Sequence, residues 1–320
     1  MDKHIAFCIN DGYAPYVAVV IKSLVVNNPG ERYVIHILAD SLTGASVEFI
    51  RSQCAGNPLL IHEVDDSQLK KLKNTWSPIA WYRILLPGLL PDVDKVLYLD
   101  ADVLVTGSVS DLFEIDMTGK SVAGVIDVQA FNQDTRSRLG EDAACWYICS
   151  GVLMMNLDYW RTHDLTERVY GWAVENDRVI AFPDQDAINA VCAGSRIVLP
   201  MKYGVLDAHF HYVWRYSEDL RRQALDALDH PVIVHYAGQA PWIYERMYHQ
   251  FQSMWDRYNS MLEKPVMKVH YKERNKSARL VVRRLLDRLH IMRLPRWYAT
   301  ENLSDEELRN RIEHGTLVNL

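Results

Sequence analysis

Short apolar runs alternate with helix-like segments along the first part of the chain. The runs have the length of buried strands, and the segments between them repeat apolar residues at helical spacing. We expect strands at 4–9, 34–38 and 59–64 and helices at 14–26 and 45–54. Pro15 suits the first turn of a helix, and the turn sequence at 27–30 ends it. This β-α-β-α-β order predicts a mostly parallel sheet with helices on both faces.

Further elements follow along the chain. We expect helices at 81–86 and 165–175 and strands at 121–127, 150–156 and 232–235. The first of these helices leads into Pro87. Because ligands bind at the carboxyl ends of strands in such sheets, polar residues that follow the strands are the candidates for chemistry.

The run at 96–105 departs from the apolar pattern because it contains two acids, Asp100 and Asp102. A buried carboxylate without a partner costs several kcal/mol or more, so a strand interior holds two acids only for a reason. Residues i and i+2 of an extended strand point the same way, so the two side chains converge on one point. Two converging oxygen donors suit a divalent cation, Mg²⁺ or Mn²⁺, of the kind that is shared with substrate phosphates.

Polar residues also stand at the ends of other predicted strands. A turn cluster at 10–13 follows the first strand, and Asp127 ends the strand at 121–127. The chain has no Gly-rich phosphate loop, so nucleotide sites of the Rossmann and Walker kinds lose support. Any nucleotide phosphates would then need a metal and basic side chains. Arg83 is such a side chain or a surface residue of its helix.

A second polar cluster, Asp184-Gln185-Asp186, follows Pro183. Asp184 is equally well interpreted as the cap of the following helix and as part of a site with Gln185. His235, at the end of a predicted strand, is a candidate third ligand for the acid pair. A histidine in such a position is more often structural.

Composition and cysteine usage bound the class of protein. The chain of 320 residues is 49% apolar and 24% charged, as in ordinary globular proteins. Its apolar runs fall short of the roughly 18–20 residues that span a bilayer, and it starts without a secretory signal, so we expect a cytoplasmic protein. Five scattered cysteines predict free, mostly buried thiols rather than disulfides. Cys145 and Cys149 lack the further ligands that a zinc site needs.

The charge is divided between the body and the C-terminal part. The net charge of −6 includes eleven Lys and Arg residues against two acids between Lys264 and Arg296. Residues 278–292 place apolar side chains on one helix face with four arginines beside it. We expect this basic helix at an anionic membrane surface, the inner face of the plasma membrane; docking on the protein's own body is the alternative. An acidic helix with a capping box at Ser304 and a stop at Gly315 follows, and it is expected to fold back on the basic helix.

Together these residues resemble glycosyltransferase family 8, the retaining enzymes that include bacterial lipopolysaccharide galactosyl- and glucosyltransferases and glycogenin. The motifs that carry the resemblance are Phe7–Tyr13, Tyr82-Arg83, Lys95–Asp102, Ser150-Gly151-Val152 through Asn156, Asp184–Asp186, His235–Gly238 and Pro241-Trp242. The resemblance implies an α/β fold of the GT-A type, a Rossmann-like mostly parallel sheet with flanking helices, over residues 1–260. Residues 261–320 would form a helical basic segment.

The resemblance also implies a UDP-sugar donor bound with Mn²⁺, or with Mg²⁺. The metal would be held by Asp100, Asp102 and His235. The uridine pocket would be lined by Cys8, Asn10, Asp11, Gly12 and Tyr13. The sugar and the diphosphate would lie near Arg83, Ala101 and the backbone of Gly238. The transferred sugar would be contacted by Gln185, Asp184 and Asp127, with Gln185 near its reacting face.

Two departures from the family pattern concern this site. Cys149-Ser150-Gly151 stands where the family often has Asn-Ala-Gly, so one amide that contacts the sugar is missing. Gln239-Ala240 precedes Pro241, where the family usually has a Lys that touches the diphosphate. The phosphate charge would then be balanced by the metal and Arg83, with Lys202 or another base.

The implied function is retaining transfer of glucose or galactose from a UDP-sugar to a glycan or lipid-linked saccharide such as lipopolysaccharide core. The metal would assist the leaving diphosphate while the acceptor hydroxyl attacks on the same face. One alternative is a UDP-sugar-binding subunit with weak or no activity, because two expected residues are missing. Another is a sugar nucleotidyltransferase, which the missing Gly-rich loop disfavours. The acidic body disfavours a nucleic-acid partner.

Overall fold

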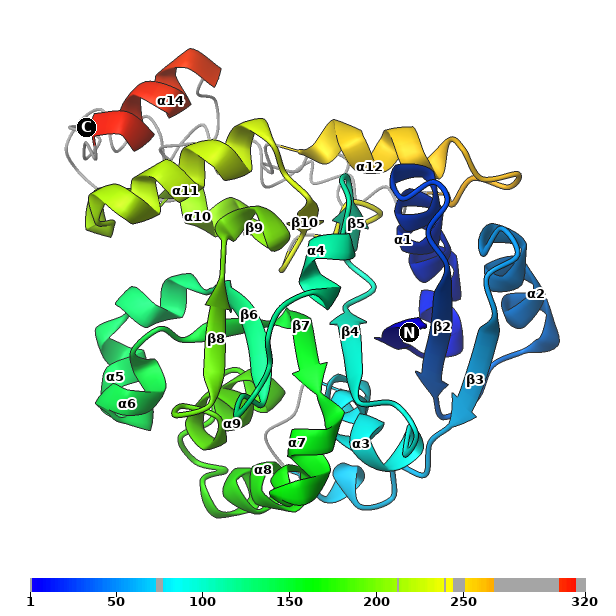
Figure 1. Cartoon of the computed structure of the whole chain (residues 1–320), viewed down its shortest axis with the longest axis horizontal. Helices are drawn as coiled ribbons and strands as arrows, with labels where there is room; N and C mark the ends of the chain where they lie inside the picture. The colour runs from blue at the N-terminus through cyan, green and yellow to red at the C-terminus, as the bar shows by residue number, and fades with distance from the viewer. Residues whose placement is uncertain are drawn as a thin grey trace, which may run out of the picture.

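The computed structural model describes residues 2–72, 77–211, 213–238, 240–243, 251–267 and 305–314. The basic helix expected at 278–292 and the capping box at Ser304 lie outside these residues, as does Gln239. The described part is an α/β body with two sheets, one above the other in the view of Figure 1. Within it, no helix combines the length and the apolar character needed to cross a bilayer.

A seven-stranded sheet forms the centre of the body, in the order β3-β2-β1-β4-β7-β6-β8. Its strands are β1 (Lys3–Cys8), β2 (Tyr33–Ala39), β3 (Leu59–Glu63), β4 (Lys95–Leu99), β6 (Val122–Ile126), β7 (Ile148–Asn156) and β8 (Arg196–Leu199). All neighbouring pairs are parallel except the two that β7 makes with β4 and β6. The expected mostly parallel sheet is confirmed, with one antiparallel strand near its centre.

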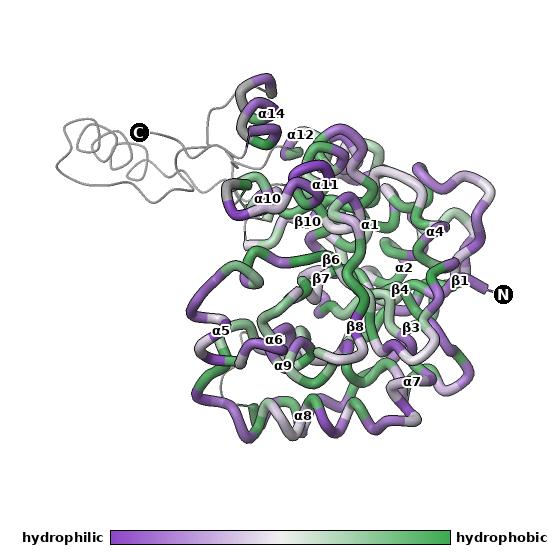
Figure 2. Tube along the Cα trace, turned by 60° about the vertical axis from the view of Figure 1, so that its left-hand side comes forward, coloured by the Kyte–Doolittle hydropathy of each residue, from purple (hydrophilic) through white to green (hydrophobic). Residues whose placement is uncertain are grey.

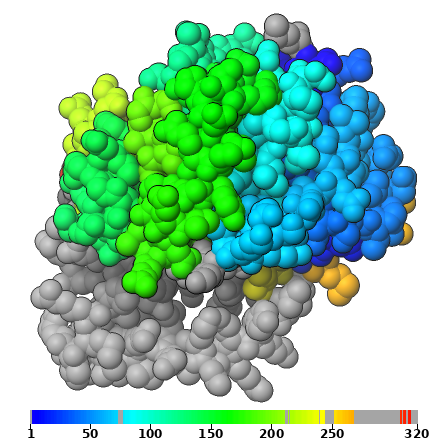
Figure 3. All heavy atoms as spheres, turned by 90° about the horizontal axis from the view of Figure 1, so that it is seen from below, coloured from blue at the N-terminus to red at the C-terminus, as the bar shows by residue number. Residues whose placement is uncertain are grey.

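Helices cover both faces of this sheet, as the sequence predicts. One face, which holds Ile5 and Phe7, packs against α1 (Ala14–Asn27) and α2 (Gly44–Gln53). The other face packs against α3 (Leu86–Leu89), α7 (Leu157–Thr162), α8 (Leu165–Glu175) and α9 (Pro183–Val191). Seen from below, α7 and α8 (green) lie beside the segment that leads into α3 (cyan) (Figure 3). Along α8 hydrophilic and hydrophobic stretches alternate, as expected of a surface helix with one buried side (Figure 2).

A smaller three-stranded sheet, in the order β5-β10-β9, lies above β4 and β7 in the view of Figure 1. Its strands are β5 (Val103–Val105), β9 (Val205–Leu206) and β10 (Ile233–His235). Helices α10 (Asp207–His211), α11 (Glu218–Asp229) and α12 (Gln252–Asn259) accompany it. Short helices complete the described body: α4 (Ser110–Phe113), α5 (Gln133–Leu139), α6 (Glu141–Ala144), η1 (Asp11–Tyr13), η2 (Leu69–Lys71), η4 (Val128–Phe131), η5 (Met201–Tyr203) and η6 (Val213–Arg215).

One local prediction is wrong and another is refined. The acids of the run at 96–105 do not lie inside one strand, because the chain turns at 100–102 and passes from β4 in the large sheet to β5 in the small one. The segment expected as a helix at 81–86 forms a 3₁₀ helix, η3 (Pro78–Leu85). Pro87 then lies in the first turn of α3, where its missing N–H has no helical partner to lose.

The last described helix, α14 (Asp305–His314), packs on the body rather than standing apart. Leu308 and Ile312 are buried, and Arg309 forms an ion pair with Asp229 at the end of α11 (Nη1 to Oδ2, 2.9 Å). The predicted helix is thus present, and its described partner is α11. The proposed division of the chain at 260/261 stays a prediction.

Candidate active site and metal-binding residues

Several strand ends meet where the large sheet adjoins the small one. β4 and β6 of the large sheet and β10 of the small one end there, and β7 begins there. Two backbone hydrogen bonds of 2.9 Å fasten the turn at 100–102: Asp100 N–H donates to Gly151 O, and Tyr236 N–H donates to Asp102 O. The turn between β4 and β5 is therefore held by both sheets.

Asp100, Asp102 and His235 form a compact group at this place. Their ligand atoms all lie within 4.8 Å of one another, and no other group of three or more His, Cys, Asp or Glu side chains does so in the part of the chain that the structure describes. His235 Nε2 is 3.2 Å from Asp102 Oδ1 and 3.9 Å from Asp100 Oδ2. The structure brings together the three side chains that the sequence predicts as ligands.

Gly151 on β7 makes room for this group. A Cβ atom at Gly151 would lie 2.2 Å from His235 Cε1 and 2.7 Å from Asp100 Oδ2. Both distances are far below van der Waals contact, so the imidazole and the carboxylate occupy the space that any larger residue would fill. The Gly of the Ser-Gly-Val motif is thus required by the packing of the site itself.

Asp100 is held by two neighbours on the side away from His235. Its Oδ1 accepts hydrogen bonds from Tyr98 (2.6 Å) and from Arg83 Nη2 (2.9 Å). The guanidinium also lies over the Tyr98 ring, 4.2 Å from its centre. The other carboxylate oxygen, Oδ2, is the one that faces His235. Two charge-assisted hydrogen bonds therefore set which oxygen of Asp100 is presented to a cation.

Arg83 itself is buried within a network of the chain's own groups. It pairs with Asp100 and with Asp184 (Nε to Oδ2, 3.3 Å), and it donates to the carbonyl groups of Ala80 and Ser150. Burial disfavours its charge, but the two carboxylates outweigh this and raise the pKa of Arg83 well above its ordinary value. The surface alternative for Arg83 is wrong. Its contact with a donor stays a prediction.

Gln185 and Asp127 lie side by side next to this network. Gln185 Oε1 accepts from Ser150 N–H (2.8 Å), and its Nε2 donates to Asp127 Oδ2 (3.3 Å). Both ends of the amide are thereby fixed. Asp127 also caps η4 by accepting from Gln129 N–H (2.8 Å). Burial raises the pKa of Asp127 and that of Asp184.

The capping interpretation of Asp184 is wrong. Phe182 occupies the position before α9 and makes no side-chain cap, and Asp184 pairs with Arg83 instead. The acid that holds the turn before α9 is Asp186, which accepts from the N–H groups of Ala181 (2.8 Å) and Phe182 (3.0 Å). Asp186 also pairs with Arg138 and accepts from Tyr147. Of the two alternatives for Asp184, the structure supports membership of the site.

The turn after β1 forms the more open wall of the site. Asn10 accepts from Tyr13 N–H (3.1 Å) and so holds η1 together, with Gly12 close against the Asn10 side chain. Asp11 reaches the other way and accepts from Thr43 N–H (2.7 Å) after β2. Tyr13 is 43% exposed. Burial of the rest of its side chain raises its pKa, and the nearby acids, Asp102 foremost, raise it further. Cys8, at the end of β1, is buried.

The segment after β10 is held by aromatic packing. Trp242 stacks on Tyr16 of α1, with ring centres 3.9 Å apart, and packs against Trp255 of α12. Gly238 has a φ of 78°, a left-handed conformation that favours glycine. Ala101 is buried in the turn at 100–102. Donor contacts of Gly238 and Ala101 stay predictions.

The residues present fit a hard divalent cation. Two carboxylates and an imidazole form the donor set, and the carboxyl groups of the site outnumber its cationic groups. Burial alone would raise the pKa of Asp102 and lower that of His235, but their mutual attraction outweighs burial and shifts both pKa values the opposite way. The group is thus built to hold positive charge, and a diphosphate approaching it would meet carboxylates unless a cation lay between.

Lys202 does not supply the missing positive charge. It pairs with Asp226 of α11 (3.4 Å), and its carbonyl accepts from Val232 N–H, at the end of β10 opposite His235.

The cysteines are all free, as expected, and all are buried except Cys145.

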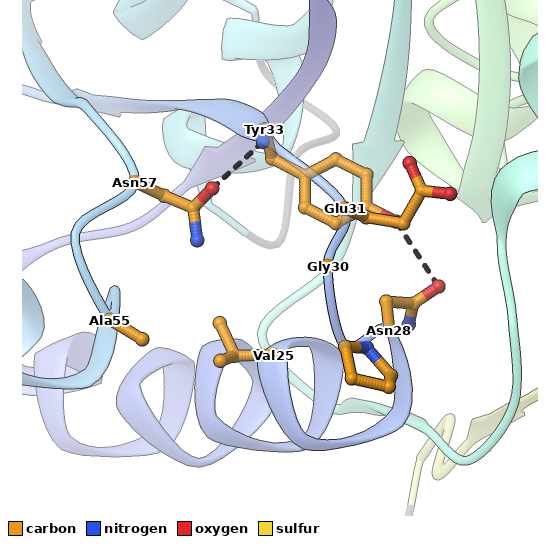
Figure 4. A pocket seen from close by; sticks show the side chains of 8 residues that line it. Val25, Asn28, Gly30, Glu31, Tyr33, Ala55 and Asn57 are labelled. Carbon is orange, nitrogen blue, oxygen red and sulfur yellow. Dashed lines mark hydrogen bonds between the residues drawn. The ribbon is translucent and has the colours of Figure 1, made fainter.

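A separate pocket lies near the amino-terminal end of β2, away from the strand ends described above (Figure 4). It holds about 180 Å³ and is lined in part by Asn28, Glu31, Tyr33 and Asn57. These polar groups already bond within the chain: Tyr33 N–H donates to Asn57 and its hydroxyl donates to Asn28, while Glu31 pairs with Lys3. The pocket therefore offers a ligand little beyond its shape.

Three residues of the site were missed by sequence reasoning. Tyr98 belongs to an apolar run of the sequence, and the one signal is its place two residues before Asp100, whose side chain it bonds. Cys149 was noted only as a departure, and the structure places its Sγ 3.5 Å from His235 Nδ1. Tyr16, which supports Trp242, carried no signal, because its partner is more than two hundred residues away in the chain.

Comparison of the sequence with known proteins gives consistent matches. A family model described as glycosyl transferase family 8 matches residues 4–246. A lipopolysaccharide 1,2-glucosyltransferase of Escherichia coli K12 is 29% identical over 248 residues, covering 75% of this chain and 72% of that protein. A second E. coli protein of the same name is 30% identical over 250 residues, covering 75% and 73%. General stress protein A of Bacillus subtilis is 25% identical, covering 75% and 87%.

Among solved structures, the galactosyltransferase LgtC in complex with donor and acceptor sugar analogs superposes with a TM-score of 0.74. It is 24% identical in sequence, and the match covers 82% of this chain and 96% of that one. This likeness shows the fold. The predicted α/β architecture of the GT-A type is confirmed.

Proposed function

The chain belongs to glycosyl transferase family 8 and is a hexosyltransferase, and on this premise we propose that it transfers glucose or galactose from a UDP-sugar, with Mn²⁺ or Mg²⁺, to a saccharide acceptor. The names of its E. coli relatives support a lipid-linked saccharide such as lipopolysaccharide core as the acceptor. The family match favours this function over a sugar nucleotidyltransferase.

The observation that carries the proposal is the convergence of Asp100, Asp102 and His235 beside the Gln185–Asp127 pair. When bound to the first three, a divalent cation neutralises the diphosphate and acts as a Lewis acid on the leaving group. Gln185 and Asp127 would then face the sugar that is attached to the diphosphate. One set of side chains serves the leaving group and the other the transferred hexose.

The side chains beside the sugar are suited to orienting it. Gln185 is fixed by Ser150 N–H and Asp127, so it presents an uncharged amide in one orientation. An amide is a weak nucleophile, whereas retaining hydrolases use a pair of carboxylates about 5–5.5 Å apart. Asp184 is tied to Arg83. These contacts support direct transfer on the face that the diphosphate leaves.

In this reaction the acceptor hydroxyl oxygen bonds to the anomeric carbon while the bond from that carbon to the diphosphate oxygen breaks. The electron pair of the broken bond leaves with UDP. The hydroxyl proton passes to an oxygen of the departing diphosphate, so no side chain has to act as the base.

The test is a UDP-release screen with UDP-glucose and UDP-galactose, with and without Mn²⁺. We expect one donor to release UDP in a Mn²⁺-dependent way, faster with a saccharide acceptor present. The variant Asp102→Asn should lose this activity. Retention of a UDP-sugar without release of UDP in the presence of acceptor would instead indicate the binding-subunit alternative.

We also propose that the enzyme works in the cytoplasm, bound to the inner face of the plasma membrane through the basic part at 264–296. Support comes from its charge and from the expected lipid-linked acceptor. Changing Arg279, Arg283, Arg284 and Arg288 to Gln in the full chain should weaken binding to vesicles of anionic lipid at least about tenfold. Binding that is unchanged would contradict this localisation.

A further inference from the structure

Cys149 contacts His235 on the side of the ring that faces away from the acids. Its Sγ is 3.5 Å from Nδ1, while Nε2 faces Asp102 and Asp100. Both side chains are buried, the cysteine at 6% and the histidine at 4% exposure. The contact is therefore a sulfur–nitrogen hydrogen bond shielded from water.

The position of Cys149 on β7 explains why it reaches the ring. Cys149 and Gly151 both lie in the stretch of β7 where its pairing with β6 shifts register, between Ile148 and Leu153. Gly151 lies against Cε1, the atom between the two ring nitrogens. The edge of the imidazole thus runs along β7, from Cys149 at Nδ1, past Gly151, to the two acids at Nε2.

This arrangement separates the thiol from the ligand group. The lone-pair directions of Nδ1 and Nε2 diverge, so one ion cannot be bound at Nε2 and also by a sulfur that lies at Nδ1. Cys149 is accordingly absent from the group whose ligand atoms lie within 4.8 Å. Its contact is with the ring, and its effect on a cation is through the ring.

We propose that Cys149 is a positioning residue for His235, with its sulfur accepting the Nδ1–H and so keeping the Nε2 lone pair directed at the cation. Metal-binding histidines commonly need such a partner, because it selects the tautomer and fixes the ring orientation. The inference rests on the proposed metal site. It also gives a function to the residue at which this chain departs from the Asn of its family.

The size of the effect follows from what the contact controls. A neutral imidazole binds a cation through Nε2 only when its proton is on Nδ1. Loss of an outer partner of a metal-binding histidine typically weakens metal affinity about 10- to 100-fold. We expect Cys149→Ala to fall in that range for Mn²⁺, and Cys149→Ser to be weakened less, since a hydroxyl oxygen can accept the same proton.

The experiment is a titration of the full-length protein with Mn²⁺ at saturating UDP, followed by the electron paramagnetic resonance signal of free Mn²⁺. The variants are Cys149→Ala and Cys149→Ser, which differ by one oxygen atom. The matched control is Cys54→Ala, because Cys54 is also buried and its Sγ bonds only a helix carbonyl, that of Ile50, among its described contacts. Thermal unfolding without Mn²⁺ is measured for each protein, so that a general loss of stability is seen separately.

The outcomes that support or overturn the proposal are as follows. Affinity lowered at least tenfold in Cys149→Ala, partly restored in Cys149→Ser and unchanged in Cys54→Ala supports it. Affinity within twofold of the wild type in Cys149→Ala, or equal weakening in both Cys149 variants, overturns it while the metal site stands. Absence of Mn²⁺ binding by the wild type overturns the metal site itself. If Cys149→Ala does not fold, the Mn²⁺ affinity of Cys149→Ser decides. An affinity equal to the wild type supports the acceptor role, and an affinity tenfold lower overturns it.

Discussion

The two sides of the site are built on different physical principles. On the side of β4, buried polar side chains orient one another: Tyr98 and Arg83 both bond Asp100 Oδ1. On the side of β10, shape is decisive: His235 fills the space that Gly151 leaves. The first side should therefore be sensitive to the loss of charge or a hydrogen bond at constant shape, and the second to the addition of atoms.

The largest effect is expected from Asp100→Asn, which changes charge at nearly constant shape. It removes a proposed ligand and leaves Arg83 with one carboxylate partner fewer. Since Lewis-acid assistance is worth several kcal/mol, Mn²⁺-dependent UDP release should fall about 1,000-fold. Asp92→Asn, at an exposed acid shortly before β4, is the control and should stay within twofold. Full activity of Asp100→Asn would refute the ligand assignment.

The next effect is expected from Gly151→Ala, which adds one atom and no charge. The new Cβ would lie 2.2 Å from His235 Cε1, so the ring has to move. We expect activity to fall about 100-fold, as a displacement of roughly 1 Å in a site can do. Gly171→Ala in α8 is the matched control, because nothing lies within 4 Å of its added Cβ. If the two variants are equally active, shape does not govern the β10 side.

A smaller effect is expected from Tyr98→Phe, which removes one hydroxyl and keeps the ring under Arg83. Hydrogen bonds to charged groups contribute about 1.5–3 kcal/mol, so activity should fall at least about tenfold, with donor KM changing less than kcat. Tyr16→Phe keeps the stack on Trp242 and should stay near the wild type. A wild-type kcat for Tyr98→Phe would show that Arg83 alone orients Asp100.

The smallest expected effect on activity is indirect and concerns the pH dependence of folding stability. It has to be measured so that unfolding at low pH is not mistaken for a loss of the site. His36 lies between His4 and His62 on three neighbouring strands. Its Nε2 is 2.9 Å from His4 Nδ1, and its Nδ1 is 3.0 Å from His62 Nε2. Burial, and to a smaller extent the two neighbouring imidazoles, lower the pKa of His36 to about 4. Its ordinary pKa is 6.5, so the unfolded chain binds the proton more readily. This part of the stability is complete above pH 6.5 and falls as the pH drops toward 4.

Urea unfolding at pH 7 and pH 5 measures this loss, which should reach up to about 2 kcal/mol in the wild type. His36→Gln should show a smaller difference between the two pH values, whatever its absolute stability. An identical pH dependence in both proteins would assign the acid sensitivity to other groups. Activity profiles below pH 6.5 should be interpreted with this loss of stability in view.

The large sheet and its helices were predictable because their residues follow local periodicity. Strands such as β1 and β2 are buried on both faces and appear as apolar runs, and Pro15 marks the start of α1. The three ligand candidates were also predictable, because polar residues that follow apolar strands are the candidates for chemistry, although His235 ends a strand of the second sheet. The strand-end position of His235 made it a candidate partner of the two acids, and the family resemblance strengthened that assignment.

The rest depends on contacts between distant parts of the chain. The sequence predicts a strand through Asp100–Asp102, because alternation of side chains alone does not show that β5 belongs to another sheet. Asp184 resembled a helix cap because a Pro-Asp sequence commonly starts a helix, whereas its partner Arg83 is a hundred residues earlier. Tyr98 and Cys149 are functional candidates only once Asp100 and His235 are placed beside them.

The most direct test of the metal site is anomalous diffraction at the manganese edge from crystals of the protein grown with Mn²⁺ and UDP. We expect one strong peak in contact with Asp100 Oδ2, Asp102 and His235 Nε2 and with the diphosphate. A peak elsewhere, or a bound diphosphate at these residues without manganese, would contradict it.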